Sequence, residues 1–274
     1  MPKPHAPKNI LCIHDLSGVG RCSLNEILPI LSTMGMHVTA LPTTLLSSHT
    51  GGLGQPAAQS CQEYGQAALA HYRNLELTFD CIYSGYLADS QQQQLVLDAF
   101  AAWPNAFKVM DPVMGDHGKL YSGMDALVPG MAQLCRAADL TVPNLTEACL
   151  LLGQEYPQQA MTEADAAALA HQVAQTFGGG AVVTGLPLGK YIGCAGAAAP
   201  DSFVQKHLCL PQSFPGTGDL FCSVLIGCLL RGNALSAAVD AAAGFVCSCI
   251  NATPAEADPR FGVWYETQLF RLIP

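Results

Sequence analysis

The sequence Pro-Gly-Thr-Gly-Asp at positions 215–219 runs directly into Leu220–Leu230, an apolar segment with the length of a buried helix. Two glycines leave the backbone N–H groups of this stretch unshielded, and the N-terminus of the helix adds its dipole. Together they predict a cradle for a phosphate or for a developing anion, with the Asp219 carboxylate directed into it. A plain helix cap is the alternative, because Asp is among the best N-cap residues. The stretch is not a Walker A loop, since no Gly-Lys-Ser/Thr follows.

Upstream of this stretch, short apolar runs of strand length alternate with segments of helical pattern. Strands are expected at Asn9–His14, His37–Pro42, Asp80–Ser84, Phe107–Met110, Asp139–Val142 and Ala181–Thr184. Helices are expected at Ser23–Thr33, Gln55–Asn74, Ser90–Ala102, Asp125–Ala137, Thr146–Leu152 and Thr162–Phe177. Downstream we expect a hairpin, Lys190–Cys194 with Phe203–Leu208, and helices at Asp219–Arg231, Ala234–Asn251 and Trp264–Leu272. This alternation predicts a single α/β domain over residues 1–274, with a mostly parallel central sheet covered by helices on both faces.

Two more motifs follow expected strands, at the carboxyl ends where open α/β sheets bind their ligands. Asp-Pro-Val-Met-Gly-Asp at 111–116 places two carboxylates, Asp111 and Asp116, on a restricted loop that could hold a magnesium ion. An ordinary turn would use the same residue types. Pro-Asn-Leu-Thr-Glu at 143–147 places Asn144 and Glu147 at the start of a helix. There they could face the crevice, form a capping box, or do both.

In order and placement, the three motifs resemble those of the ribokinase-like superfamily, and within it the vitamin kinase branch that holds pyridoxal kinase and hydroxymethylpyrimidine kinase. The resemblance covers the chain from Ile10 to about Asn251. It implies a ribokinase-like fold without a separate lid domain, because the region 38–86 has no room for the lid sheet of the sugar kinases. The resemblance also implies that Asp219 is the catalytic base. The anion hole beside it would consist of Gly216, Thr217 and Gly218.

The resemblance assigns the nucleotide side of the site as well. The residues that would bind ATP are Asp111, Asn144, Glu147, Thr184, Gly216, Thr217 and Gly218. Asp116 and Glu147 would hold the Mg²⁺ that accompanies ATP. Thr184 also fits the position at which the family can bind a monovalent cation.

The amino-terminal third is expected to select the substrate. His49 and Thr50 belong to a stretch that looks like the Ser-Asn-His-Thr run of pyridoxal kinases, and Tyr86 to one that resembles their Thr-Gly-Tyr. Residues 15–20 instead read Asp-Leu-Ser-Gly-Val-Gly, which is closer to the hydroxymethylpyrimidine kinases. Asp15, with Ser17 beside it, could pair with a protonated pyridine nitrogen or with an aminopyrimidine.

The resemblance therefore predicts an ATP-dependent kinase that phosphorylates the 5′-hydroxymethyl group of a vitamin B6 vitamer (pyridoxal, pyridoxamine or pyridoxine). A hydroxymethylpyrimidine (phosphate) kinase of thiamine synthesis is one alternative, and a non-catalytic vitamin binder is another. Asp219 speaks against a pure binder, which has no need of a base there. A homodimer is expected because the resembling kinases are commonly dimers.

Composition limits the partners that the chain can have. Charged residues make up 12% of its 274 residues, and 12 Lys and Arg against 21 Asp and Glu give a formal net charge of −9. This argues against a broad electrostatic footprint on nucleic acid or on an anionic membrane. Leu220–Leu230 is too short for a membrane span, which needs about 20 residues. Twelve cysteines without a CxxC pair, after a start unlike a secretory signal, favour the reducing cytoplasm.

Overall fold

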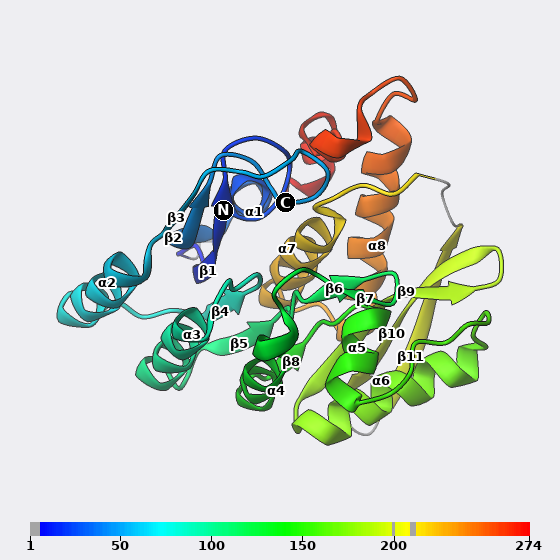
Figure 1. Cartoon of the computed structure of the whole chain (residues 1–274), viewed down its shortest axis with the longest axis horizontal. Helices are drawn as coiled ribbons and strands as arrows, with labels where there is room; N and C mark the ends of the chain where they lie inside the picture. Colours follow the sequence, from blue (N-terminus) through cyan, green and yellow to red (C-terminus); the bar gives the residue numbers. More distant parts are fainter. Residues whose placement is uncertain (1–5, 199–200, 209–211) are drawn as a thin grey trace, which may run out of the picture.

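A nine-stranded sheet forms the centre of the molecule, in the order β11-β10-β9-β8-β5-β4-β1-β2-β3 (Figure 1). A computed structural model describes residues 6–198, 201–208 and 212–274. The strands of the main sheet are β1 (Asn9–Ser17), β2 (His37–Leu46), β3 (Ala58–Ser60), β4 (Cys81–Ser84), β5 (Phe107–Met110), β8 (Leu140–Thr141), β9 (Gly180–Leu188), β10 (Tyr191–Ala198) and β11 (Asp201–Leu208). Neighbours from β2 to β9 pair in parallel, whereas β3, β10 and β11 are added antiparallel at the two edges.

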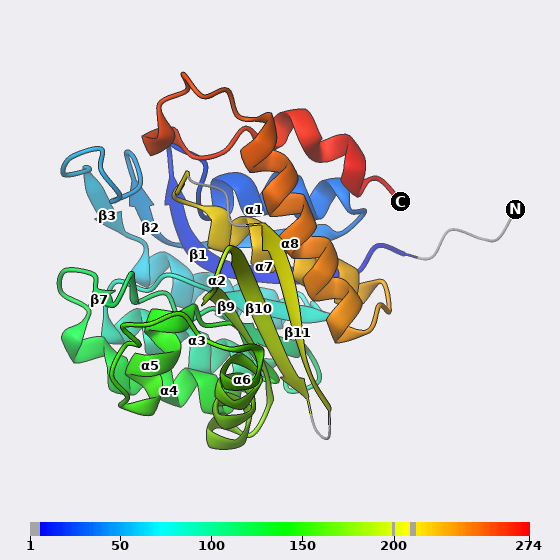
Figure 2. The ribbon, with the colours of Figure 1, turned by 90° about the vertical axis from the view of Figure 1, so that its right-hand side faces the viewer.

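Helices cover both faces of this sheet, as the alternation of the sequence predicts. They are α1 (Leu24–Thr33), α2 (Gln62–Asn74), α3 (Ser90–Ala102), α4 (Val128–Ala137), α5 (Leu145–Leu152), α6 (Glu163–Phe177), α7 (Thr217–Leu230) and α8 (Leu235–Ala252), with 3₁₀ turns η1 (Asp125–Leu127), η2 (Pro259–Phe261) and η3 (Tyr265–Leu272). Figures 1 and 2 show α1, α7 and α8 on one face and α2 to α6 on the other. No separate lid domain is evident among the described residues, and the mixed α/β architecture is the predicted one.

The period of the strands explains why the sheet has two buried faces. Successive side chains of a strand point to opposite sides. In β1, Leu11 and Ile13 pack in the cluster under α2 to α6, whereas Ile10 and Cys12 pack in the cluster under α1, α7 and α8. Near-continuous apolar strands of this kind are typical of parallel sheets that helices cover on both sides.

Three local features differ from the sequence-based expectation. The helix expected from Gln55 begins only at Gln62, because residues 58–60 form β3 against the end of β2. Such short edge pairing depends on the neighbouring strand more than on the residues themselves. Asp116 lies in a small hairpin, β6 (Gly115–Asp116) with β7 (Lys119–Leu120), rather than in a plain loop. β1 continues to Ser17, so Asp15 lies inside the strand.

Helix α8 is long and apolar enough, by length and composition alone, to cross a membrane. The core helix of a globular protein passes the same test. One side of α8 contributes Ala238, Val239, Ala242, Phe245 and Cys249 to the cluster that it shares with α7. About a third of the helix (33%) is buried, so α8 packs on the domain by this one side.

Candidate active site

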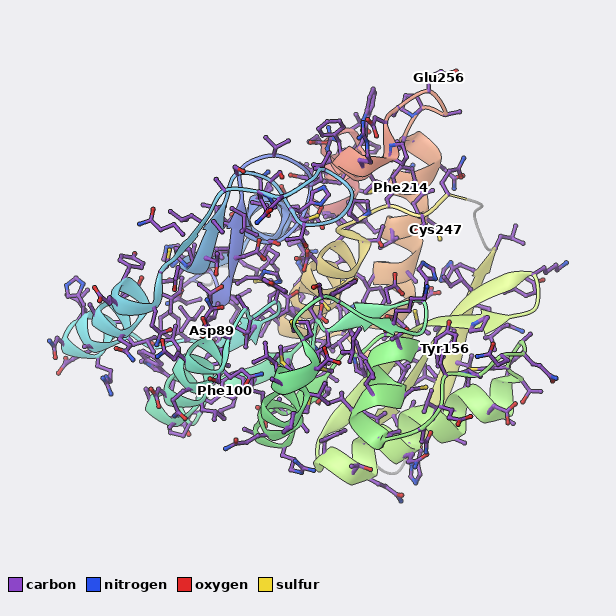
Figure 3. The ribbon with its side chains drawn as sticks, in the orientation of Figure 1. Asp89, Phe100, Tyr156, Phe214, Cys247 and Glu256 are labelled. Carbon is purple, nitrogen blue, oxygen red and sulfur yellow. The ribbon has the colours of Figure 1, made fainter. Side chains whose placement is uncertain are left out.

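A cavity of about 560 Å³ opens at the carboxyl ends of β5, β8 and β9 and reaches the N-terminus of α7. The sequence-predicted residues that line it are Asp111, Asp116, Asn144, Glu147, Thr184, Gly216, Thr217, Gly218 and Asp219. Figure 3 labels three further lining residues, Tyr156 after α5, Phe214 before α7 and Cys247 on α8. The fold thus brings the three motifs to one cavity, as their positions after strands predict.

Gly216 begins α7, and only glycine fits its place. It is the N-cap residue with φ +83°, a left-handed conformation that side chains disfavour. A Cβ built on it would lie 1.9 Å from the carbonyl oxygen of Arg21. A Cβ on Gly218, in contrast, would meet nothing within 4 Å. The first turn of α7 therefore presents its free N–H groups at the cavity with little side-chain cover.

Asp219 lies in the first turn of α7 but is not its cap, which corrects the alternative interpretation of this residue. The cap is Gly216, without a side-chain hydrogen bond. The Asp219 carboxylate instead faces the end of β1 and the start of α1: Oδ2 accepts from the Ser23 N–H at 2.7 Å, and Oδ1 lies 3.1 Å from His14 Nε2. Its side chain is 12% exposed and borders the cavity. A carboxylate held in this way can accept a proton from a group bound in the cavity.

The Asp15 carboxylate is engaged within the protein. Its Oδ1 accepts from Ser23 Oγ at 2.7 Å and lies 2.8 Å from His14 Nδ1, and its Oδ2 accepts from Ser17 Oγ at 2.9 Å. Burial raises the pKa of Asp15, but the hydrogen bond and charge of His14 and the two serine hydroxyls lower it below its usual value. Both Asp15 and Ser17 are buried and hydrogen-bonded within the protein, and their expected contact with a substrate ring stays a prediction.

Asp111 and Glu147 form a buried acidic pair in the lining of the cavity. Burial and the charge of Asp219 raise the pKa of Asp111 to about 7, although Cys222 Sγ donates to Asp111 Oδ2 at 3.3 Å. Burial, and then Asp111, raise the pKa of Glu147 well above its usual value. Glu147 and Asn144 form the capping box that the sequence offers as one interpretation, while both also line the cavity. The two interpretations of this motif therefore hold together.

The two residues expected to hold Mg²⁺ differ in how far their carboxylates are exposed and hydrogen-bonded within the protein. Asp116 has 49% of its side chain exposed, whereas both oxygens of Glu147 accept backbone N–H groups, from Met114 at 3.0 Å and Asn144 at 2.8 Å. Within the described ranges, no three His, Cys, Asp or Glu side chains are grouped so that they could hold a metal by themselves. A magnesium ion here would take its other ligands from phosphate and water, as Mg²⁺ commonly does.

The residues expected to select the substrate lie beyond the lining of this cavity. His49 Nε2 donates to the Arg260 carbonyl at 2.6 Å, and His49 Nδ1 accepts from the Gly51 N–H at 3.0 Å, so the ring fastens its own loop to η2. Thr50 next to it is exposed. Tyr86 is half-buried, and burial, followed by the charge of Asp15, raises its pKa. His49 therefore holds the loop in place, and Thr50 is the residue of the two that is free to meet a ligand.

Sequence reasoning missed His14, Ser23 and Cys222. His14 lies between two carboxylates, Ser23 donates to both of them, and Cys222 donates to Asp111. The available signal for His14 was its position at the end of the first strand, directly before Asp15. Burial lowers the pKa of His14, but the charges and hydrogen bonds of Asp219 and Asp15 outweigh burial and raise it to about 10.

Solved structures resemble this chain over nearly its whole length. A Bacteroides thetaiotaomicron protein, provisionally described as a phosphomethylpyrimidine kinase and crystallised with pyridoxal, is 35% identical with a TM-score of 0.91. The alignment covers 97% of this chain and 96% of that one. Pyridoxal kinase from Lactobacillus plantarum is 33% identical with a TM-score of 0.89, and the coverage is again 97% and 96%.

Curated relatives and a family model agree with this similarity. The pyridoxine/pyridoxal/pyridoxamine kinase of Bordetella avium is 30% identical over 252 residues, which cover 85% of this chain and 81% of that protein. The chain spans only 58% and 65% of the length of two Schizosaccharomyces pombe relatives, provisionally named pyridoxal kinases. The family model described as phosphomethylpyrimidine kinase matches residues 32–262. With most of its length matched by this model, the chain belongs to the phosphomethylpyrimidine kinase family.

Proposed function

We propose that this protein is an ATP-dependent kinase that phosphorylates the 5′-hydroxymethyl group of a vitamin B6 vitamer. The observation that carries the proposal is the Asp219 carboxylate beside the open first turn of α7, on the wall of a cavity that also contains the two other motifs. The names of the Bordetella avium and Lactobacillus plantarum relatives and the pyridoxal in the Bacteroides crystal support the choice of vitamer.

Asp219 is the base in this proposal. A primary alcohol is a poor nucleophile at neutral pH, so a positioned carboxylate helps by accepting the proton as the alcohol attacks the γ-phosphorus. Oδ1 and Oδ2 each use one lone pair toward His14 and Ser23, and a carboxylate offers about four acceptor positions. About two positions therefore remain free, and one of them can take the substrate hydroxyl. The backbone N–H groups at Gly216–Gly218 and the dipole of α7 stabilise negative charge on the phosphoryl group in transit.

The nucleotide occupies the cavity beyond Asp219. Asn144, which follows β8, and Thr184, inside β9, lie opposite each other in an isolated parallel bridge, and both line the cavity. They are suited to the phosphates, and Thr184 also to a monovalent cation. Asp116 would hold Mg²⁺ directly and the buried Glu147 through water. When bound, Mg²⁺ would neutralise charge between the β- and γ-phosphates.

The vitamer lies on the other side of Asp219, toward the carboxyl ends of β1, β2 and β4. Thr50 and Tyr86 are the residues from these elements that would contact the ring. Asp15 and Ser17 would support the site from behind, through His14 and Ser23. We also infer a homodimer in the cytoplasm, from the family resemblance and the cysteine-rich composition. Light scattering during size exclusion tests the dimer.

A coupled assay of ADP release tests the function directly. Pyridoxal, pyridoxamine, pyridoxine and hydroxymethylpyrimidine are compared at equal concentrations with MgATP. The proposal expects kcat/KM to be highest for a B6 vitamer. Faster turnover of hydroxymethylpyrimidine than of every vitamer would instead assign the chain to thiamine synthesis. Tight binding of pyridoxal without release of ADP would make it a vitamin binder.

A further inference from the structure

His14 lies buried in β1 next to Asp219, which lines the cavity, whereas His14 itself is not one of the lining residues. Its imidazole is 2% exposed and lies between two carboxylates, with Nδ1 2.8 Å from Asp15 Oδ1 and Nε2 3.1 Å from Asp219 Oδ1. Resting on the kinase function proposed above, we propose that His14 is a positioning residue: an imidazolium that keeps the Asp219 carboxylate ionised and fixed in direction.

The ring geometry admits two arrangements. As an imidazolium, His14 donates from both nitrogens to the two carboxylates. In the alternative arrangement the ring is uncharged and one of its nitrogens accepts a backbone N–H. The donor is then the Asp15 N–H, 3.0 Å from Nδ1, or the Tyr86 N–H, 3.3 Å from Nε2. At each nitrogen the carboxylate oxygen is the nearer partner. Hydrogen bonds between ionised groups are also roughly twice as strong as those between neutral ones.

The charges around His14 favour the imidazolium. Two carboxylates touch the ring, and Tyr83 of β4 packs beside it with ring centroids 6.2 Å apart. A third carboxylate, Asp111 after β5, lies close enough for the charge of His14 to lower its pKa. No Lys or Arg forms an ion pair with Asp15 or Asp219 within the described part of the chain. Without a charge on His14, two carboxylates that share a buried site would repel each other, and one would take up a proton.

Asp15 and Gly85 fix the ring in this position. The Asp15 carboxylate is itself held by Ser17 and Ser23. A Cβ on Gly85 would lie 2.1 Å from His14 Nε2, so the ring packs directly on the backbone at the end of β4. This close packing restricts rotation of the His14 ring on the Gly85 side. The Ser23 N–H holds the second oxygen of Asp219, so the direction of the base is set from both sides.

His14→Gln tests the charge, because glutamine retains a hydrogen-bond donor without the positive charge. A neighbouring cation shifts a carboxyl group by about 1–3 pH units in favour of its ionised form. The acid limb of the kcat profile should therefore move upward by about one to three pH units, with KM for ATP little changed. His37→Gln is the matched control. His37 is exposed at the first residue of β2, opposite the start of β1, and its substitution should leave the profile unchanged. An acid limb that stays in place while kcat falls at every pH would assign His14 a merely structural role and overturn the proposal.

A double-mutant cycle separates action through Asp219 from general damage. If His14 acts on the base, His14→Gln should change kcat by less than about twofold in an Asp219→Asn background, because coupled residues lose their effect together. Losses that multiply independently would contradict the proposal.

The direct test needs no turnover and holds even if the kinase function fails. In uniformly ¹⁵N-labelled wild-type protein, long-range ¹H–¹⁵N correlation spectra report the protonation of each of the eight histidines. The His14 signal is assigned by its loss in His14→Gln or, should that variant not fold, by its shift in Gly85→Ala. We expect both His14 nitrogens to carry protons at pH 8, where an ordinary histidine with a pKa of about 6.5 is mostly neutral. A bare nitrogen on His14 at pH 7 would overturn the proposal, whereas inactivity toward every vitamer with a doubly protonated His14 would refute only the proposed function.

Discussion

Asp111→Asn should stabilise the free protein at neutral and alkaline pH. Asp111 is buried at the end of β5, and burial together with the charge of Asp219 raises its pKa from 3.8 to about 7. An acid with a raised pKa holds its proton more tightly in the folded state than in the unfolded state. The free energy of unfolding therefore falls as the pH rises from about 4 to about 7, and the loss is complete above pH 7.

The magnitude follows from the size of this shift. Each pKa unit corresponds to about 1.4 kcal/mol, so a displacement of about three units costs the folded state up to about 4 kcal/mol at pH 8. Asn has nearly the same shape and no charge. Relative to wild type, Asp111→Asn should therefore gain up to about 4 kcal/mol in unfolding free energy between pH 4 and pH 8. Activity should fall at the same time, because a charge on the nucleotide side of the cavity is lost.

Urea unfolding of both proteins at pH 4, 6 and 8, without nucleotide or Mg²⁺, measures this difference. Titratable groups other than Asp111 and its neighbours make nearly equal pH-dependent contributions to the unfolding free energy of the two proteins. These contributions therefore largely cancel in the difference. Asp116→Asn is the matched control, since it removes an exposed carboxylate from the adjoining hairpin and should change the stability by less than about 0.5 kcal/mol. An Asp111→Asn protein that is no more stable than wild type at pH 8, or a difference that does not vary with pH, would refute the reasoning.

Three further substitutions test separate parts of the site. Asp116→Ala should raise the Mg²⁺ concentration needed for half-maximal turnover without lowering the melting temperature, and an unchanged Mg²⁺ dependence in the folded variant would remove Asp116 from the metal site. Thr50→Val should weaken vitamer binding, measured by calorimetry, by about five- to 150-fold, as expected for about 1–3 kcal/mol when a polar group of the buried vitamer is left without a partner; equal losses for ATP would indicate a folding defect instead. Gly216→Ala should cost at least about 1–3 kcal/mol in urea unfolding, since a residue with φ +83° would bring its Cβ to 1.9 Å from a backbone oxygen; an unchanged midpoint would show that the start of α7 adapts.

The sequence predicted what local pattern and motif order can determine. Apolar runs of strand length located the six parallel strands, and helical periodicity located the main helices, because these signals depend on neighbouring residues. Motifs placed after strands predicted the cavity, since the carboxyl ends of parallel strands meet at one edge. β3 was missed because three exposed residues become a strand only when the end of β2 lies beside them.

The internal contacts of the site could not be predicted in the same way. The Ser23 N–H binds a carboxylate 196 residues away, and this pairing arises only when α1 and α7 pack side by side. The position of His14 between Asp15 and Asp219 arises from the same packing, so no local pattern distinguishes His14 from an ordinary buried histidine. Asp219 also reads as an N-cap in the sequence, and it is the left-handed Gly216 that begins the helix three residues earlier.

The turnover of pyridoxal by Asp219→Asn tests the central claim most directly. Asn keeps the shape of Asp and can still accept the Ser23 N–H, so the fold should persist. General-base assistance is worth about 10²–10⁴ in rate, and kcat should fall by about that factor while both Michaelis constants change little. Asp165→Asn is the matched control, because Asp165 occupies the same position in the first turn of α6, away from the cavity, and its loss should leave kcat unchanged. A folded Asp219→Asn protein with near-normal kcat would contradict the assignment of Asp219 as the base.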